Sequence, residues 1–173
     1  MPRVVVLVEG ESDALVVRPL AVRRGLAVDV VAMGGITNIR RYADGLAGDA
    51  TLLGLVDAAE RRYLENLDPP LAGVFVCERD LEEELVRALG PTAVVEVLEQ
   101  TGVIGSFRTF QGQPEWRGRD LTAQVRRFAG AGSGRKSLLA AAMAVRLGDD
   151  EVPAPLVSLL DAAETAGGDS LRR

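Results

Sequence analysis

The chain has 173 residues, 47% of them hydrophobic, so it is long enough for one well-buried core and too short for two ordinary domains. It has no histidine and a single cysteine, Cys77, which excludes imidazole catalysis, imidazole zinc sites, an intrachain disulfide and a thiolate metal cluster. The formal net charge of −5 argues against a protein that coats nucleic acid through bulk positive charge, but it leaves open acidic residues that hold metal ions.

The first half of the chain alternates short β-branched runs with helical patterns. The pair Pro69-Pro70 ends the third helical pattern, because proline cannot continue a helix. The alternation is typical of βαβ units in a parallel sheet with helices on both faces. We predict strands over residues 3–8, 27–33, 51–56 and 73–77, and helices over residues 12–24, 36–46 and 58–67.

The second half of the chain has mainly helical patterns, with apolar residues at helical spacing over residues 81–89, 93–100, 121–128, 137–147 and 156–166. Between them we expect a loop over residues 105–119, where Trp116 stands among several arginines. This loop could contact a nucleic-acid backbone and stack on a base, or it could be plain solvated surface. We therefore predict an α/β fold, with a parallel sheet of about four strands in residues 1–90 and a helical extension over residues 91–173 packed on the same domain.

No segment reaches the roughly 18 to 20 uninterrupted apolar residues that a membrane span needs. The apolar start, Val4 to Val8, stops at Glu9, which is typical of a strand and not of a signal peptide. We therefore expect a cytoplasmic protein without membrane association. The sequence leaves an oligomeric assembly open.

Acidic residues follow three of the four predicted strands. Ligands of parallel α/β sheets bind at the carboxyl ends of the strands, where the loops converge. Ionised carboxylates that meet there repel one another, which favours raised pKa values or a bound divalent cation. Oxygen ligands without histidine or cysteine suit Mg²⁺ or Mn²⁺. The candidates, in chain order, are Glu9, Asp13, Asp57, Glu60, Asp80 and Glu82.

Some of these acids also have purely structural explanations. Asp13 and Glu60 could simply favour the positive end of a helix macrodipole. Asp80 with Glu83 fits an N-cap box, and we expect Glu84 on a solvated helix face. Glu9 and Asp57, which stand directly at strand ends, fit such roles poorly, because strand-end carboxylates do not cap helices by default.

Several short motifs resemble those of Toprim domains. The run Val8–Asp13 is similar to the Toprim signature, in which a glutamate opens a Gly-containing turn after the first strand. Asp57 is similar to the first acid of the family's second motif. The segments 34–39, 79–85 and 132–136 resemble the Toprim half of OLD-family (overcoming lysogenisation defect) endonucleases, of which small standalone relatives occur. The resemblance covers about residues 4–147.

The resemblance implies a Toprim-like fold and a metal-dependent nuclease that hydrolyses or nicks nucleic acid, with DNA as the expected substrate. Glu9 and Lys136 are the implied catalytic residues, and Lys136, the only lysine, would stabilise charge on the phosphorus. Any control by ATP would come from a partner ATPase in trans. The implied ligands of one or two Mg²⁺ or Mn²⁺ ions are Glu9, Asp13, Asp57, Asp80 and Glu82.

One departure from the family pattern bears on the ligand set. The second Toprim motif commonly reads Asp-x-Asp, whereas Ala59 stands at its third position. Glu60, one residue further along, is the candidate substitute. Ala59 also fits an alternative, a catalytically degenerate Toprim module that binds nucleic acid or a partner ATPase without cutting.

Two other functions are less compatible with the sequence. A receiver-like signalling domain also has a strand-end aspartate and a lysine, but receivers place paired acids at the end of the first strand and their lysine ends a fifth strand. The run Gly130–Ser137 resembles a phosphate-binding P-loop, but Arg135 stands where that loop needs glycine and the preceding pattern is helical. An interhelical turn is the simpler explanation of this run.

Overall fold

The computed structural model describes residues 3–168, apart from the side chain of Ser133. Its centre is a four-stranded parallel sheet in the order β2-β1-β3-β4. The predicted α/β class, with about four parallel strands flanked by helices, is therefore confirmed. The strands are β1 (Arg3–Val8), β2 (Val28–Ala32), β3 (Ala50–Asp57) and β4 (Gly73–Cys77).

The strand β1 is buried on both faces because it lies in the middle of the sheet. Side chains alternate between the two faces of a strand, so Val4, Val6 and Val8 enter one hydrophobic cluster. Val5 and Leu7 enter the other cluster. This double burial explains the uninterrupted apolar run near the start of the sequence, and it holds the carboxyl end of β1 in a fixed place.

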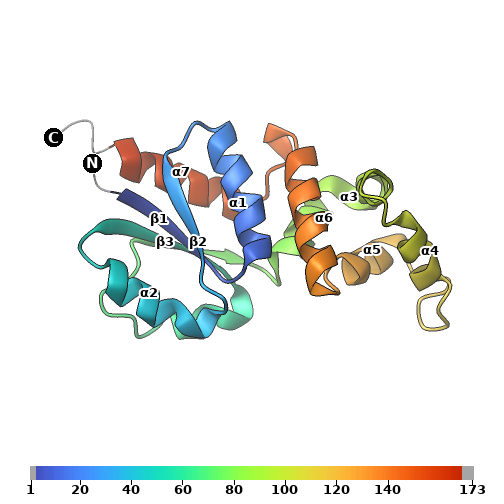
Figure 1. The fold of residues 1–173 in the computed structure, drawn as a ribbon, viewed down its shortest axis with the longest axis horizontal. Helices are drawn as coiled ribbons and strands as arrows, with labels where there is room; N and C mark the ends of the chain where they lie inside the picture. Colours follow the sequence, from blue (N-terminus) through green and yellow to red (C-terminus); the bar gives the residue numbers. More distant parts are fainter. Residues whose placement is uncertain (1–2, 169–173) are drawn as a thin grey trace.

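Helices cover both faces of the sheet (Figure 1). On one face, α1 (Glu11–Arg23) and α7 (Ala154–Gly168) pack together with the cluster that contains Val4. On the other face, the short turn η1 (Ile36–Asn38) and α2 (Ile39–Leu46) cover the second cluster. The helix α7 contacts β3 and β4, so a segment far along the chain completes the cover of the sheet.

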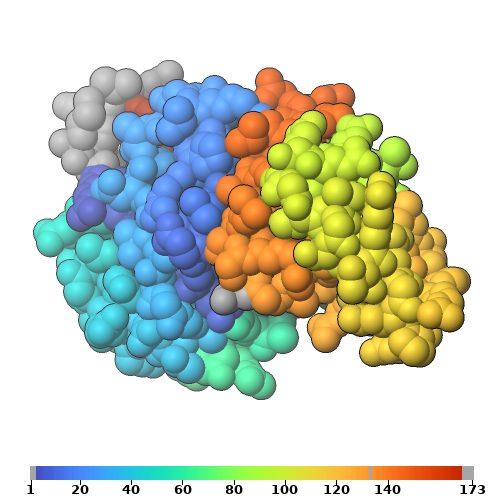
Figure 2. Space-filling view, turned by 45° about the vertical axis from the view of Figure 1, so that its right-hand side comes forward, coloured from blue at the N-terminus to red at the C-terminus, as the bar shows by residue number. Residues whose placement is uncertain are grey.

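The other helices form a group beside the sheet (Figure 1), and Figure 2 shows the residues of this group, coloured yellow-green to orange, packed against the N-terminal part of the chain. The helix α6 packs along α1, and α3 packs on both α5 and α6. Their apolar side chains belong to the same cluster as one face of the sheet, so the sheet and the helical group share one continuous core. The bounds are α3 (Leu81–Gln100), α4 (Ile104–Gln111), α5 (Leu121–Ala129), α6 (Ser133–Arg146) and the turn η3 (Asp149–Glu151).

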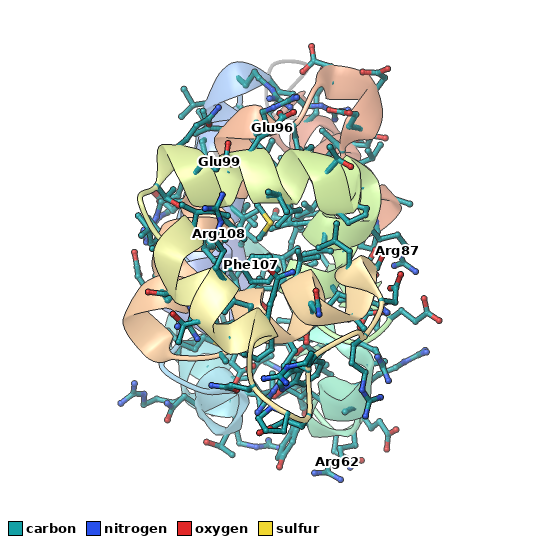
Figure 3. All side chains as sticks on the ribbon, turned by 90° about the vertical axis from the view of Figure 1, so that its right-hand side faces the viewer. Arg62, Arg87, Glu96, Glu99, Phe107 and Arg108 are labelled. Atoms are coloured by element: carbon teal, nitrogen blue, oxygen red, sulfur yellow. The ribbon has the colours of Figure 1, made fainter. Side chains whose placement is uncertain are left out.

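The segment that we predicted as a loop over residues 105–119 begins as a helix, α4, so the prediction was wrong for that part. Phe107 is 1% exposed and packs edge-on against Phe128, with ring centroids 5.1 Å apart. Phe110 packs on Trp116, with ring centroids 4.9 Å apart. Figure 3 shows Phe107 in the middle of the helical group. These tertiary contacts between rings stabilise a helix that is too short to be stable alone.

The helix that we predicted over residues 58–67 is also wrong. The segment forms a 3₁₀ helix, η2 (Ala58–Tyr63), followed by an irregular stretch. Its first two residues are exposed, and only Leu64 and Leu67 anchor the segment in the hydrophobic core. An amphipathic α-helix therefore has too few apolar side chains here to bury.

The two helices predicted over residues 81–89 and 93–100 form one element, α3, with a kink between them. Gly90 has a φ of 76°, a conformation that glycine adopts without steric cost, and Pro91 restarts the helix after it. The helix therefore bends at the Gly-Pro pair. Within residues 3–168, no helix combines the length and apolar character that crossing a membrane requires.

We expect Phe107→Ala to lower the free energy of unfolding by about 3–5 kcal/mol, because it leaves a cavity beside the rings of Phe110 and Phe128. Urea denaturation followed by circular dichroism measures the change. Val22→Ala is the control, since Val22 is 76% exposed and its truncation should cost less than about 0.5 kcal/mol. Equal losses in the two variants would contradict the packing described for α4.

Candidate metal centre

Three carboxylates from two neighbouring central strands meet at the carboxyl edge of the sheet. Glu9 follows β1, Asp57 is the last residue of β3, and Glu60 lies on η2 directly after it. Each offers one carboxylate oxygen, and these oxygens all lie within 4.8 Å of one another. Val8 of β1 pairs with Leu55 of β3 in parallel. This pairing brings Glu9 and Asp57 close together, because it places the ends of both strands at one edge of the sheet. The predicted convergence of Glu9 and Asp57 is therefore present.

The geometry of η2 explains why Glu60 joins the group. Side chains three residues apart lie one above the other in a 3₁₀ helix, so Glu60 follows Asp57 on the same side. Ala59 is exposed to solvent on another side. One oxygen of Glu60, Oε2, is buried and has no hydrogen-bond partner among the described residues. A buried acceptor without a donor fits a position that is meant for a cation.

Asp13 belongs to the same site. Its Oδ2 accepts a hydrogen bond from the backbone N–H of Gly10 at 2.9 Å, which fixes the turn between β1 and α1. Asp13 lines a small cavity together with the three acids of the first group, and Cys77 and Leu81 form part of its apolar wall. The cavity volume is about 10 Å³, close to the space that one water-sized sphere occupies.

The carboxylates in this cavity have raised pKa values. Burial, followed by the charges of Glu60 and Asp13, raises the pKa of Asp57 to about 7. Burial and then the charge of Glu9 raise the pKa of Glu60, and burial raises the pKa of Asp13 despite its hydrogen bond from Gly10. Each shift reports an ionised form that the apolar wall and the like charges disfavour. A divalent cation would remove this penalty, and the all-oxygen donor set suits a hard ion.

A second acidic group lies next to the first. Asp80 caps α3, because its Oδ1 accepts a hydrogen bond from the backbone N–H of Glu83 at 2.7 Å. Its charge also contributes to the raised pKa values of Asp13, Asp57 and Glu82, so its carboxylate lies near both groups. The predicted capping role of Asp80 is therefore confirmed, and it does not remove Asp80 from the edge of the site.

Glu82 and Lys136 form an ion pair between α3 and α6. Glu82 is only 3% exposed, and its Oε2 lies 3.3 Å from Lys136 Nζ. Its other oxygen, Oε1, is buried without a hydrogen-bond partner among the described residues. Burial raises the pKa of Glu82, although Lys136 opposes the shift. Burial lowers the pKa of Lys136, but the charges of Glu82 and Asp13 raise it by more. The pKa therefore lies above its ordinary value, and the lysine stays charged.

The run Gly130–Ser137 contains the turn between two helices and the first residues of the second helix. Gly130 and Ala131 follow the end of α5, and α6 begins at Ser133. No strand precedes the turn, so the interhelical explanation is confirmed and a P-loop is not formed. The turn places Lys136 in the first part of α6, where it faces the acids of α3.

The prediction for Glu84 was wrong. Glu84 is 6% exposed, not solvated. Its Oε1 accepts a hydrogen bond from the backbone N–H of Glu78 at 3.0 Å, and its Oε2 lies 2.5 Å from Arg87. These contacts fasten the end of β4 to α3, because a buried carboxylate needs donors for its oxygens. The spacing of Glu84 and Arg87, three residues apart on a helix, was the signal that could have indicated the pair.

Sequence patterns also missed three arginines beside the site. Arg79 follows β4, whereas Arg126 and Arg127 lie near the end of α5. Arg79 and Arg126 each form an ion pair with the carboxylate of Glu83. The packing of α5 on α3 brings these residues together, and no local sequence motif predicts that contact.

Comparisons with known proteins agree with this architecture. No family model matches the chain, and no curated protein matches it by sequence. Among solved structures, the C-terminal region of the OLD protein of Xanthomonas campestris pv. campestris is 22% identical and superposes with a TM-score of 0.71, covering 100% of this chain and 99% of that one. The C-terminal region of the Burkholderia pseudomallei OLD protein is 19% identical, with a TM-score of 0.65 and coverage of 96% and 98%. The chain has the fold of the OLD C-terminal region. The resemblance to the Toprim half of OLD proteins is thereby confirmed at the level of the fold.

We expect Asp57→Asn to raise the melting temperature of the metal-free protein at pH 8 by about 2–4 °C, on the order of 1 kcal/mol once the partial exposure of the side chain is allowed for. The folded-state pKa of Asp57 is about 7 against an ordinary value of 3.8, so stability falls as the pH rises from about 4 to 7 and the loss is complete above 7. The gain should therefore disappear at pH 4.

Thermal melts in EDTA at pH 8 and pH 4 measure this effect. Asp44→Asn is the matched control, since Asp44 is exposed on α2 and forms no ion pair with any described residue. A gain of equal size in the control, or the same gain at both pH values, would contradict local repulsion at Asp57.

Proposed function

We propose that the chain is a metal-dependent nuclease that hydrolyses or nicks phosphodiester bonds in nucleic acid, with DNA as its substrate. One observation carries the proposal: Glu9, Asp57 and Glu60 each present a carboxylate oxygen within 4.8 Å of the others. Asp13 lines the same cavity. The likeness of the fold to the C-terminal region of OLD proteins supports the same class of chemistry.

The acids divide into two sets that suit one or two Mg²⁺ or Mn²⁺ ions. Glu9, Asp13, Asp57 and Glu60 would hold an ion at the cavity. Asp80 and Glu82 would contribute from the start of α3. Bound divalent ions supply the charge that activates a water nucleophile and stabilises the leaving oxygen of a phosphodiester.

Lys136 has a separate role in the proposed site. Its ammonium group is anchored by Glu82 at 3.3 Å, and the side chain is still 37% exposed, so it can reach a substrate placed over the acids. A fixed positive charge stabilises the negative charge that develops on the phosphoryl oxygens in the transition state. The carboxylates would hold the metal ions, and Lys136 on α6 would supply the positive charge that neutralises the phosphoryl oxygens.

The competing proposal is a catalytically degenerate Toprim module that binds nucleic acid or a partner ATPase without cutting. Its support is Ala59, which replaces the second acid of the Asp-x-Asp motif. The position of Glu60 counts against it, because Glu60 supplies an oxygen to the group that Ala59 cannot. A supercoiled plasmid incubated with Mg²⁺, Mn²⁺ or no metal distinguishes the two, since only the nuclease produces nicked or linear DNA.

Glu9→Gln should lower metal-dependent plasmid nicking by about 100-fold or more, because a neutral amide is a poor ligand for a hard cation. The fold should remain, since Glu9 lies at the edge of the sheet and not in the core. Gel analysis of nicked plasmid over time measures the rate. Glu65→Gln is the control, because Glu65 is exposed in the segment after η2. Full activity of Glu9→Gln would refute the site.

Lys136→Ala should slow nicking by about 100-fold while the Mg²⁺ concentration for half-maximal rate stays nearly unchanged, because the lysine acts on the phosphoryl group and not on the ion. Rates measured across a Mg²⁺ series separate the two quantities. Lys136→Arg is the control variant, since it keeps a positive charge near Glu82 and should retain more activity than the alanine variant. An unchanged rate for Lys136→Ala would reduce this residue to a structural partner of Glu82.

A further inference from the structure

We propose that a cleft between α3 and α5 binds a backbone phosphate of the same nucleic-acid strand, next to the phosphate that is cleaved. The cleft has a volume of about 350 Å³. This inference rests on the proposed function and adds a substrate-positioning subsite to it. The residues that line the cleft are Arg79, Asp80, Glu83, Ala123, Arg126, Arg127 and Gly130.

The cleft begins where the metal centre ends. Asp80 lines it, and the charge of Asp80 also acts on Asp13, Asp57 and Glu82. A ligand that fills the cleft therefore lies next to the carboxylate edge. Nucleic-acid strands carry one phosphate per nucleotide, so a strand with one phosphate over the metal centre presents further phosphates to the surroundings of that centre.

The charges in the cleft favour an anion. Three guanidinium groups line it, against the carboxylates of Asp80 and Glu83. Arg79 and Arg126 share the Glu83 carboxylate, which neutralises part of their charge and holds both side chains in place. Arg127 is exposed, and no ion pair joins it to another described residue. The excess positive charge therefore lies on Arg127, at a site whose other arginines are already ordered.

The chemistry of these side chains selects phosphate. Guanidinium groups present several N–H donors in a plane and bind phosphate oxygens through paired hydrogen bonds. Ala123 and Gly130 keep the rest of the wall free of large side chains. Contacts of this type carry no sequence information, so the cleft would position the strand and not read its bases.

The segment around Trp116 is a weaker candidate for the same role. Its indole ring packs on Phe110, with centroids 4.9 Å apart, and Arg119 lies over that ring at 6.0 Å. Arg117 is committed to the carbonyl oxygen of Gly112. The ring thus contributes to the packing of α4, which leaves it poorly placed to stack on a base. Arg108 is exposed on α4, next to this segment, and serves below as the comparison residue for this weaker candidate surface (Figure 3).

The test is the affinity of the full chain for a fluorescein-labelled 20-nucleotide DNA, measured by fluorescence anisotropy in Ca²⁺, which we use to prevent cleavage. Arg127→Ala should weaken binding about fivefold to tenfold at low salt, because it removes a charge-assisted phosphate contact. The slope of log K against log salt should fall by about 0.7–0.9, the value for one phosphate contact. Arg127→Lys should keep most of the affinity and the slope.

Arg108→Ala is the matched control: it removes the same charge from another exposed position of the helical group and should change affinity less than about twofold. Equal losses in the two alanine variants, or an unchanged slope in Arg127→Ala, would overturn the subsite. A fluorescent ATP analogue serves as a second probe. If the analogue binds in a way that depends on Arg127 while DNA binding does not depend on Arg127, the cleft is a nucleotide site. That outcome would also overturn the proposal.

Failure of the subsite and failure of the nuclease remain distinguishable. If Glu9→Gln stops nicking while Arg127→Ala binds DNA as the wild type does, the nuclease holds and the subsite falls. If the wild type never nicks DNA but binds it with the expected dependence on Arg127, the subsite holds and the nuclease falls.

Discussion

The crowding of half-buried carboxylates at the carboxyl edge of the sheet is the constraint on which the rest of this structure depends. Four acids share a cavity with room for about one water-sized sphere, and burial, followed by the charges of Glu60 and Asp13, raises the pKa of Asp57 to about 7. Such a group costs stability unless a cation shares its charge. The fold tolerates the cost because two central strands, buried on both faces, hold the carboxyl edge in place. The pattern is typical of a site in which stability is given up for binding.

Three positively charged side chains border this edge and do not enter the cavity. Lys136 is paired with Glu82 on the helical side, and Arg79 and Arg126 are paired with Glu83 beyond it. An acidic centre with a basic margin can accept a polyanion even though the net charge of the chain is −5. The overall charge of a protein therefore says little about its substrate when a few residues decide the local field.

The sequence was sufficient where one element alone decided the outcome. All four strands follow from short apolar runs, and the strand-end acids Glu9 and Asp57 follow from those strands because parallel strands share one carboxyl edge. It was insufficient where a distant segment decided. The helix α4 depends on the rings of Phe128 and Trp116, and the arginine cleft depends on α5 packing against α3.

The segment after Asp57 differs from the expected one in helix type and not in the acid that it supplies. We expected an α-helix after β3 and named Glu60 as the candidate substitute for the acid that Ala59 lacks. In the structure this segment is a 3₁₀ helix with three residues per turn, which places residue 60 one turn beyond Asp57. An α-helix would also bring residue 60, and not residue 59, near Asp57. An acid at position 59 would point to solvent, where Ala59 is exposed. An acid at position 60 can therefore bring an oxygen to the cluster where an acid at position 59 could not.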